Sequence, residues 1–167
     1  MKFIGNTFII TLAAAASLAL GAVGDAGAVV ESQTELAPSV QIQEARFGLL
    51  NTDADGKLSF VPATVVPLKE GQSYAWFVRM KTDKKQVKWR EEFTLPAPPQ
   101  SWGEPEAEGK RTFSADSRTS VTERVVEPVN GQIYNSWAVV KGDPAGKYSI
   151  RVFVEGRLAG VFNFEVR

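Results

Sequence analysis

Residues 73–82 read Ser-Tyr-Ala-Trp-Phe-Val-Arg-Met-Lys-Thr, and this stretch decides the fold class. Large apolar side chains recur there at every second residue, the spacing that places them on one face of a β-strand: Tyr74, Trp76, Val78 and Met80. Phe77 falls on the opposite face. A strand with apolar residues on both faces is expected to be central, and to be covered from both sides over part of its length.

The rest of the chain repeats this alternation in segments separated by turn residues. They are residues 39–51, 57–66, 86–94, 111–115, 119–128, 132–140, 147–154 and 158–166. Pro62 predicts an edge strand or a bulge in the second of these segments. Strands at spacings of about 8–12 residues, with no convincing helical periodicity after residue 38, predict an all-β fold. We expect an antiparallel β-sandwich of seven to nine strands that is immunoglobulin-like in architecture.

A Pro-, Gly- and Glu-rich segment, residues 95–110, interrupts the alternation and predicts one long loop. Trp102 lies inside it. A tryptophan on a projecting loop can contact a partner or stack on a sugar ring. The other interpretation is that Trp102 folds back and plugs the open end of the sandwich. A carbohydrate-binding module would need Trp102 exposed in a row with strand aromatics such as Trp89 or Tyr74.

Two stretches resemble an uncharacterised family of bacterial exported β-sandwich proteins. The first is residues 66–77, a turn with Gly71 followed by the aromatic strand. The second runs from the Gly-Asp-Pro-Ala-Gly turn at 142–146 to the final Phe-Asn-Phe-Glu-Val strand at 162–166. The resemblance covers about half of the chain after residue 28. It implies the immunoglobulin-like sandwich and carries no activity, cofactor or site residue with it.

The N-terminus has the three parts of a secretory signal peptide. Met1-Lys2 is a short positive start, residues 8–20 are almost wholly apolar, and residues 25–28 end on small side chains in an A-x-A pattern. We expect cleavage near Ala28; an uncleaved membrane anchor is the alternative. The predicted organisation is then a signal peptide at 1–28, a flexible lead-in at 29–38 and a single β-sandwich domain at 39–167. We therefore expect a periplasmic or secreted protein with no transmembrane anchor.

Composition excludes several classes of function. The 167 residues include 19 basic and 19 acidic side chains, so no net charge favours nucleic acid or an anionic membrane. The chain has no cysteine and no histidine. Thiol chemistry, lipidation of an N-terminal cysteine, Ser-His-Asp catalysis and histidine-based zinc sites are thus ruled out. We expect no cofactor.

Residues 51–58, Asn-Thr-Asp-Ala-Asp-Gly-Lys-Leu, match the first half of a calcium-binding loop, with oxygen ligands at Asn51, Asp53 and Asp55. The twelfth position, which should supply a carboxylate, is Pro62. The flanking segments also have the pattern of strands, not helices. A polar hairpin turn with Asp-Gly at the bend is the favoured interpretation.

The remaining charged residues indicate solvated surface. Lys81, Lys84, Lys85, Lys88 and Arg90 lie close to Glu91 and Glu92, and such mixtures usually form an exposed face. No catalytic motif stands out, so we expect a non-enzymatic interaction module of the bacterial cell envelope. Its partner would be an envelope protein, bound by loops or an edge strand, or a glycan. A hydrolase using only carboxylates is the remaining alternative.

Overall fold

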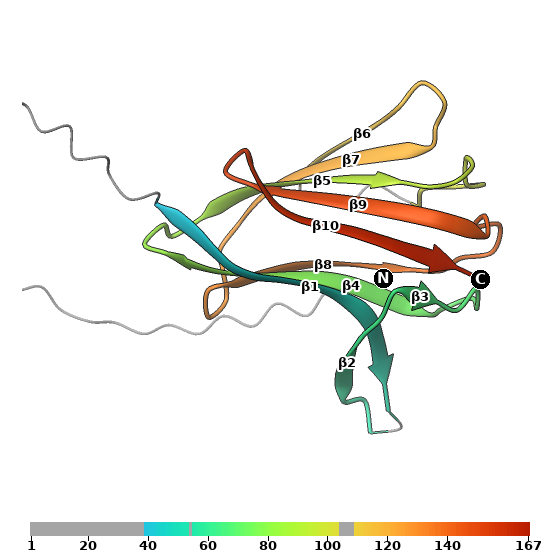
Figure 1. Ribbon diagram of the computed structural model, residues 1–167, viewed down its shortest axis with the longest axis horizontal. Helices are drawn as coiled ribbons and strands as arrows, with labels where there is room; N and C mark the ends of the chain where they lie inside the picture. The colour runs from blue at the N-terminus through green and yellow to red at the C-terminus, as the bar shows by residue number, and fades with distance from the viewer. Residues whose placement is uncertain (1–38, 54, 104–108) are drawn as a thin grey trace, which may run out of the picture. The chain divides into compact units, whose positions relative to one another are not determined.

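The computed structural model describes residues 39–53, 55–103 and 109–167, which form two packed β-sheets and no helix (Figure 1). Nothing in these ranges forms a helix long and apolar enough to cross a membrane. In chain order the strands are β1 Val40–Thr52, β2 Leu58–Pro62, β3 Val65–Val66, β4 Ser73–Thr82, β5 Val87–Thr94, β6 Lys110–Phe113, β7 Thr119–Val126, β8 Gln132–Ala138, β9 Gly146–Val154 and β10 Arg157–Val166. The predicted signal peptide and lead-in lie outside the described residues.

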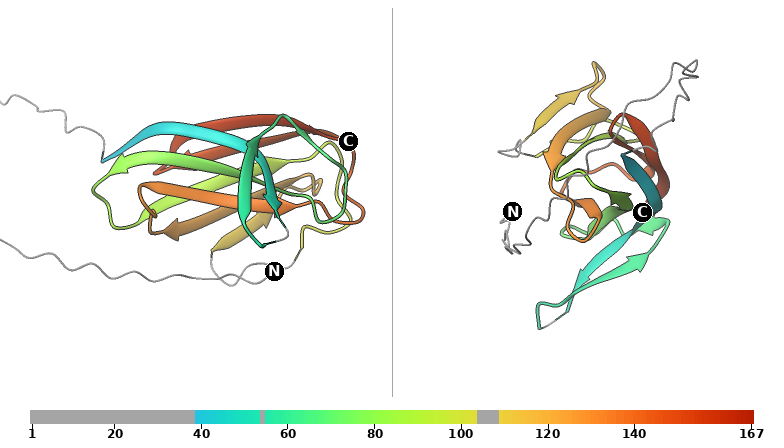
Figure 2. Two further views of the ribbon diagram at one scale, coloured as in Figure 1. Left: turned by 90° about the horizontal axis from the view of Figure 1, so that it is seen from below. Right: turned by 90° about the vertical axis from the view of Figure 1, so that its left-hand side faces the viewer.

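The strands divide into a four-stranded sheet, β2-β1-β4-β8, and a six-stranded sheet, β3-β10-β9-β5-β7-β6. The two sheets lie face to face, and the β1–β2 hairpin projects beyond them (Figure 2). Every pairing is antiparallel except that of β3 with β10, which is parallel. The all-β, immunoglobulin-like sandwich is confirmed, with ten described strands where seven to nine were expected.

The extra strand arises because the segment 57–66 serves both sheets. Pro62 ends β2 at the edge of the four-stranded sheet, as its missing N–H predicts. The chain then crosses over, and Val65 and Val66 pair with the end of β10. The backbone of β2 comes close to Gly48 of the neighbouring strand β1, since a Cβ on Gly48 would lie 2.1 Å from the Val61 carbonyl oxygen. Only glycine fits at that position.

The core lies between the sheets and follows the alternation seen in the sequence. The β4 side chains expected on one face are all buried there: Tyr74, Trp76, Val78 and Met80. Alternate residues of β5 and β9 pack against them from the six-stranded sheet. The Trp76 and Trp89 rings meet edge to face at 5.4 Å between centroids. Each fully buried large side chain contributes roughly 1.5–3 kcal/mol, so this apolar layer holds the sheets together without a disulfide.

The opposite face of β4 is also covered, as the position of Phe77 predicted. Ala75 is 1% exposed although it points away from the core. Phe77 is only partly exposed, because Phe60 of β2 and Tyr134 of β8 contact its ring. The cover on this side therefore comes from neighbouring strands of the same sheet.

Candidate functional site

The most densely hydrogen-bonded side chain in the core is a carboxylate, Glu91 of β5, which is 0% exposed. Its oxygens accept hydrogen bonds from three side chains of the opposite sheet. Trp76 Nε1 donates to Oε2, Trp137 Nε1 lies 3.1 Å from Oε1, and Asn135 Nδ2 lies 3.3 Å from both oxygens. One glutamate of the six-stranded sheet thus ties together β4 and β8 of the four-stranded sheet.

The position of Glu91 follows from strand alternation. Trp89 and Phe93, two residues away on either side, are buried in the core, so Glu91 must also point inward. We expected Glu91 to belong to a solvated charged face, and that prediction is wrong. A carboxylate can lie there because buried N–H donors replace the water that it loses.

Two arginines place positive charge near this carboxylate. Arg111 of β6 lies over the Trp137 ring at 5.1 Å, and Arg124 of β7 lies over the Trp89 ring at 5.8 Å. Burial raises the pKa of Glu91, whereas its hydrogen bonds and the charge of Arg111 act in the opposite direction. Desolvation lowers the pKa of both arginines, and the charge of Glu91 acts against that effect.

This arrangement is suited to holding the sheets together. Trp76, Asn135 and Trp137 all donate N–H groups to Glu91, so toward them the carboxylate serves as an acceptor. A general acid or base must reach its substrate within hydrogen-bonding distance, and a carboxylate that is 0% exposed has no such access. Glu91 therefore acts as a polar cross-link between the two sheets.

The outer side of the four-stranded sheet carries a second cluster, made of aromatic and cationic side chains. Arg46 of β1, Phe77 of β4 and Tyr134 of β8 lie directly across from one another in register. The Phe77 and Tyr134 rings stack at 5.5 Å, and Phe60 meets Phe77 edge to face at 4.9 Å. Arg79 and Lys81 continue the outward side of β4. We call this cluster the aromatic face: Arg46, Phe60, Phe77, Arg79, Lys81 and Tyr134.

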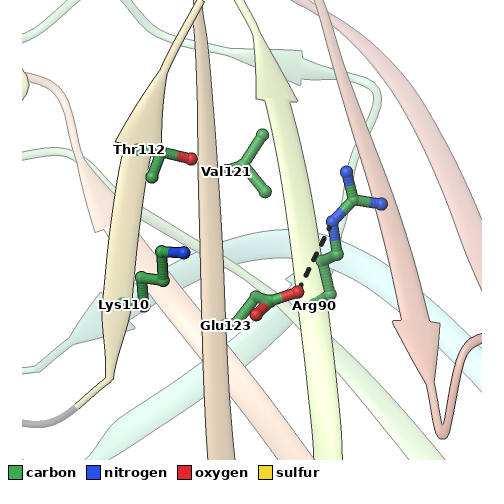
Figure 3. A pocket seen from close by; sticks show the side chains of 5 residues that line it. All are labelled: Arg90, Lys110, Thr112, Val121 and Glu123. Atoms are coloured by element: carbon green, nitrogen blue, oxygen red, sulfur yellow. Dashed lines mark ion pairs between the residues drawn. The ribbon is translucent and has the colours of Figure 1, made fainter.

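The outer side of the six-stranded sheet is different, because its charges pair with one another. Glu92 lies 3.0 Å from Arg151 and 2.6 Å from Arg90, and Glu123 pairs with Arg90 and Lys88. An open pocket of about 230 Å³ lies on this surface (Figure 3). Its lining, Arg90, Lys110, Thr112, Val121 and Glu123, mixes both signs of charge. Nothing about it selects an anionic or a cationic ligand.

Trp102 lies against the end of the core and is partly buried. Its ring contacts Phe93, Phe113 and Trp137 at centroid distances of 5.7, 5.9 and 6.2 Å. Its indole N–H donates to the carbonyl oxygen of Ser117 at 2.9 Å. These contacts match the interpretation in which the loop folds back over the open end of the sandwich.

The other aromatic residues considered for sugar binding are core residues. Trp89 is 1% exposed and Tyr74 is 3% exposed. A row of exposed rings made from Trp102, Trp89 and Tyr74 is therefore wrong, because two of its members have no surface to offer. The exposed aromatic cluster lies on the other side of the four-stranded sheet.

The calcium-like segment is a hairpin turn between β1 and β2. Asp53 Oδ1 accepts hydrogen bonds from the backbone N–H groups of Asp55 and Lys57 at 3.1 and 2.8 Å. Gly56 takes φ +79°, the left-handed conformation expected of glycine in an Asp-Gly turn. Asn51 lies just before, paired with Ser59. Across the described ranges, no group of three or more Asp, Glu, His or Cys is placed to hold a metal ion.

The basic cluster expected around residues 81–90 does not form one surface. Lys81 lies on the outer side of the four-stranded sheet, whereas Lys88 and Arg90 lie on the outer side of the six-stranded sheet. Lys84 lies between them and pairs with Glu155. The turn between β4 and β5 separates these charges because it carries the chain from one sheet to the other.

Comparison with known proteins identifies the fold family. A family described as "PM0630 beta sandwich domain" matches residues 45–167. The chain belongs to the PM0630 beta-sandwich domain family. Membership in a β-sandwich family, which the two resembling stretches implied, is confirmed at that level. No curated protein matches the chain significantly.

One solved structure supports the same architecture for this PM0630-type domain. An immunoglobulin-like protein from Pseudomonas aeruginosa is 15% identical, with a TM-score of 0.55 over 77% of this chain and 96% of that one. At this identity the likeness is one of fold. An alkylpurine DNA glycosylase from Pseudomonas fluorescens, solved bound to DNA containing an abasic site analogue, is 11% identical with a TM-score of 0.35. That match covers 77% of this chain and 30% of the glycosylase, and it supports no inference.

Two features of this PM0630-type domain were missed in the sequence, although both left a signal. The alternation of Trp89, Glu91 and Phe93 indicates that Glu91 points into the core, but charged residues are rarely buried, so a surface position was expected. The aromatic face was indicated by Phe77 alone. Phe60 and Tyr134 reach it from strands whose sheet partners the sequence does not specify.

Proposed function

We propose that this protein is an exported, non-catalytic binding module of the bacterial cell envelope. The observation that carries the proposal is a contrast between two clusters. The densely hydrogen-bonded carboxylate, Glu91, is sealed in the core, whereas the aromatic face lies on the outer side of a sheet and includes Tyr134 at 54% exposure. The buried carboxylate cannot reach a substrate in solvent, whereas the aromatic face is open to a binding partner.

The sequence supports the exported part of the proposal. Residues 1–28 have the charged start, apolar stretch and small-residue end of a signal peptide. They lie outside the described residues, so the support rests on their sequence. Because the chain has no cysteine, it can form no disulfide bond and cannot be lipidated on an N-terminal cysteine. A periplasmic or secreted domain of this kind must depend on its apolar core.

The nature of the surfaces supports binding over catalysis. Aromatic side chains and arginine are the residue types that dominate binding energy in interfaces. The aromatic face combines Phe60, Phe77 and Tyr134 with Arg46 and Arg79. A carboxylate-only hydrolase would need two carboxyl groups facing a shared cleft. Glu91, the fully buried carboxylate, faces indole and amide N–H groups instead.

The alternative of a carbohydrate-binding module stays in view because of the aromatic face. In that case Tyr134 and Phe77 take the role first considered for Trp102, Trp89 and Tyr74. Both versions of the proposal use the same surface, and they differ in whether an envelope protein or a glycan covers it.

The test combines localisation with capture on the intact chain. The full chain, tagged at its C-terminus, is expressed in its host, the cell fractions are separated, and the intact mass of the protein is measured. We expect a processed chain that begins near Val29, in the periplasm or medium. Cross-linking in the cell followed by purification should capture an envelope component that the Tyr134→Ala variant fails to capture. An unprocessed chain confined to the cytoplasm would refute the proposal.

A further inference from the structure

We propose that the aromatic face binds an acidic polysaccharide. Sugar rings would pack on Tyr134 and Phe77, and the carboxylate or phosphate groups of the glycan would pair with Arg79 and Lys81. This inference rests on the proposed function, because it names the class of ligand that the binding module takes. Ring geometry, an imbalance of charge and the polar groups beside the rings support this assignment.

The rings form a corner on the outer side of the sheet. Phe77 and Tyr134 are direct cross-strand neighbours, and their planes differ by only 23°. Phe60 stands against them with its plane at 77° to that of Phe77. The guanidinium of Arg46 covers Phe60 at 5.5 Å, so Tyr134 is the most accessible ring of the three, with the partly exposed Phe77 beside it. The negative π faces of such rings attract weakly positive C–H groups, which a pyranose ring presents on its flat sides.

The cations of this cluster outnumber their carboxylate partners. Arg46 pairs with Glu44 at 3.4 Å, and Glu44 is also the residue across from Arg79 in register. Within residues 39–53, 55–103 and 109–167, no ion pair involves Arg79 or Lys81, and both are exposed. The face therefore has three cations and one nearby carboxylate. On the six-stranded sheet the outward carboxylates Glu92 and Glu123 pair with Arg90, Arg151 and Lys88, whereas Arg79 and Lys81 of the aromatic face are available to pair with an anionic ligand.

Polar side chains on β8 favour a sugar over an apolar peptide side chain. Gln132 and Ser136 lie two residues before and after Tyr134, so all three point to the same side of the strand. Gln132 lies across from Arg79, and Ser136 lies across from Ala75. An exposed phenol flanked by an amide and a hydroxyl supplies donors and acceptors for sugar hydroxyl groups. A protein hot spot more often surrounds its aromatic anchor with apolar contacts that exclude water.

The experiment measures binding of the purified full chain to defined polymers by affinity electrophoresis and isothermal titration calorimetry. Polygalacturonate supplies carboxylates, a phosphomannan supplies phosphates, and fully methyl-esterified polygalacturonate is the uncharged match for the first. Poly-L-glutamate supplies the same charge without sugar rings. We expect binding to at least one acidic polysaccharide, weaker binding at high salt, and little binding to the methyl ester or to poly-L-glutamate.

Variants locate the binding on the molecule. Tyr134→Ala should weaken binding roughly tenfold, whereas Tyr134→Phe should keep most of it because the ring remains. The double variant Arg79→Gln, Lys81→Gln should remove the preference for the acidic polymer over its methyl ester. Val125→Ala and Lys110→Gln change an exposed apolar and an exposed basic residue on the six-stranded sheet, and both should bind as the unmodified protein does.

Several results would overturn the inference. Equal binding to poly-L-glutamate would show that the aromatic face binds acidic polypeptides. Polysaccharide binding that Tyr134→Ala leaves unchanged would show that the ligand binds elsewhere on the molecule. Binding to neither acidic polysaccharide would overturn it directly, as would self-association that Tyr134→Ala abolishes. If any of these occurs while the chain is still processed and found in the envelope, the proposed function survives and this inference fails.

Discussion

Replacing Glu91 with glutamine tests whether the buried carboxylate holds the two sheets together. Glutamine has the same shape, so the substitution leaves no cavity. It removes the negative charge and exchanges one acceptor oxygen for an NH₂ group that only donates. We expect the variant to fold, with a lower free energy of unfolding.

The contacts of Glu91 set the size of this loss. Trp76 Nε1 donates to Oε2, while Trp137 Nε1 lies closer to Oε1, at 3.1 Å, than to Oε2, at 3.3 Å. If the NH₂ group replaces Oε2, the Trp76 N–H loses its acceptor; if it replaces Oε1, Trp137 loses its closer acceptor and keeps only the oxygen at 3.3 Å. A buried donor that loses a charged partner costs about 1.5–3 kcal/mol. Relief of the buried charge offsets part of this cost, and we expect a net loss of about 2 kcal/mol.

The assay is urea unfolding of the full chain, followed by tryptophan fluorescence. Trp76 and Trp89 contact each other in the core and report on its packing. Glu92→Gln is the matched control, because Glu92 is the next residue on β5 and points outward. It pairs with Arg90 and Arg151 at the surface, where ion pairs contribute only about 0–1 kcal/mol.

The comparison between the two variants decides the outcome. A loss for Glu91→Gln that is clearly larger than that for Glu92→Gln supports the cross-link. Equal losses, or an unchanged midpoint for Glu91→Gln with the same denaturant slope, would refute the reasoning.

Further predictions concern the pH dependence of stability, the packing of Trp102, the close contact between β1 and β2 at Gly48, and calcium binding. Burial raises the pKa of Glu91 from its ordinary 4.5, so the folded protein keeps a proton that the unfolded chain has already released. The part of the stability that depends on this bound proton is therefore complete below the pKa of the unfolded chain and is lost as pH rises through the pKa of the folded protein. The hydrogen bonds that Glu91 accepts are a separate contribution. Urea titrations from roughly pH 4 to pH 8 should show this fall in the unmodified protein and lack it in Glu91→Gln. Trp102→Ala should lower the free energy of unfolding by about 2 kcal/mol, because it removes half-buried ring contacts and one hydrogen bond; Trp102→Phe should lose less, and equal losses would contradict the packing role. Gly48→Ala should separate β2 from β1, since its Cβ would lie 2.1 Å from the Val61 carbonyl oxygen, and hydrogen exchange of β2 amides should accelerate. Calcium titrated into the protein should give no binding heat, because Asp53 already caps its own turn; a saturable heat would restore the calcium interpretation.

Strand alternation predicted much of the fold because it acts over a few residues. The inward side chains of β4 and the second apolar side of that strand, marked by Phe77, were readable from spacing alone. Pro62 predicted an edge because a missing N–H cannot be hidden in the middle of a sheet. The division of residues 57–66 between two sheets was not readable, because pairing of β3 with the end of β10 joins residues about a hundred positions apart in the chain.

The candidate surfaces were less predictable for the same reason. Strand alternation favoured the core for Trp89 and Tyr74, and only the carbohydrate-binding alternative needed them at the surface; the structure buries both. Glu91 looked solvated because charged residues usually are. Its donors come from β4 and β8, which lie in the other sheet and at distant positions in the sequence.

The sequence by itself determined the local properties of this protein: its β-strands, its turns, its lack of thiol and imidazole chemistry, and the expectation of export. Those properties depend on residue type and spacing, which act over a few residues. Only the tertiary structure decided that Glu91 joins the two sheets and that Phe60, Phe77 and Tyr134 share one surface. Both depend on which strands become neighbours, and strand pairing is set by packing of the whole core.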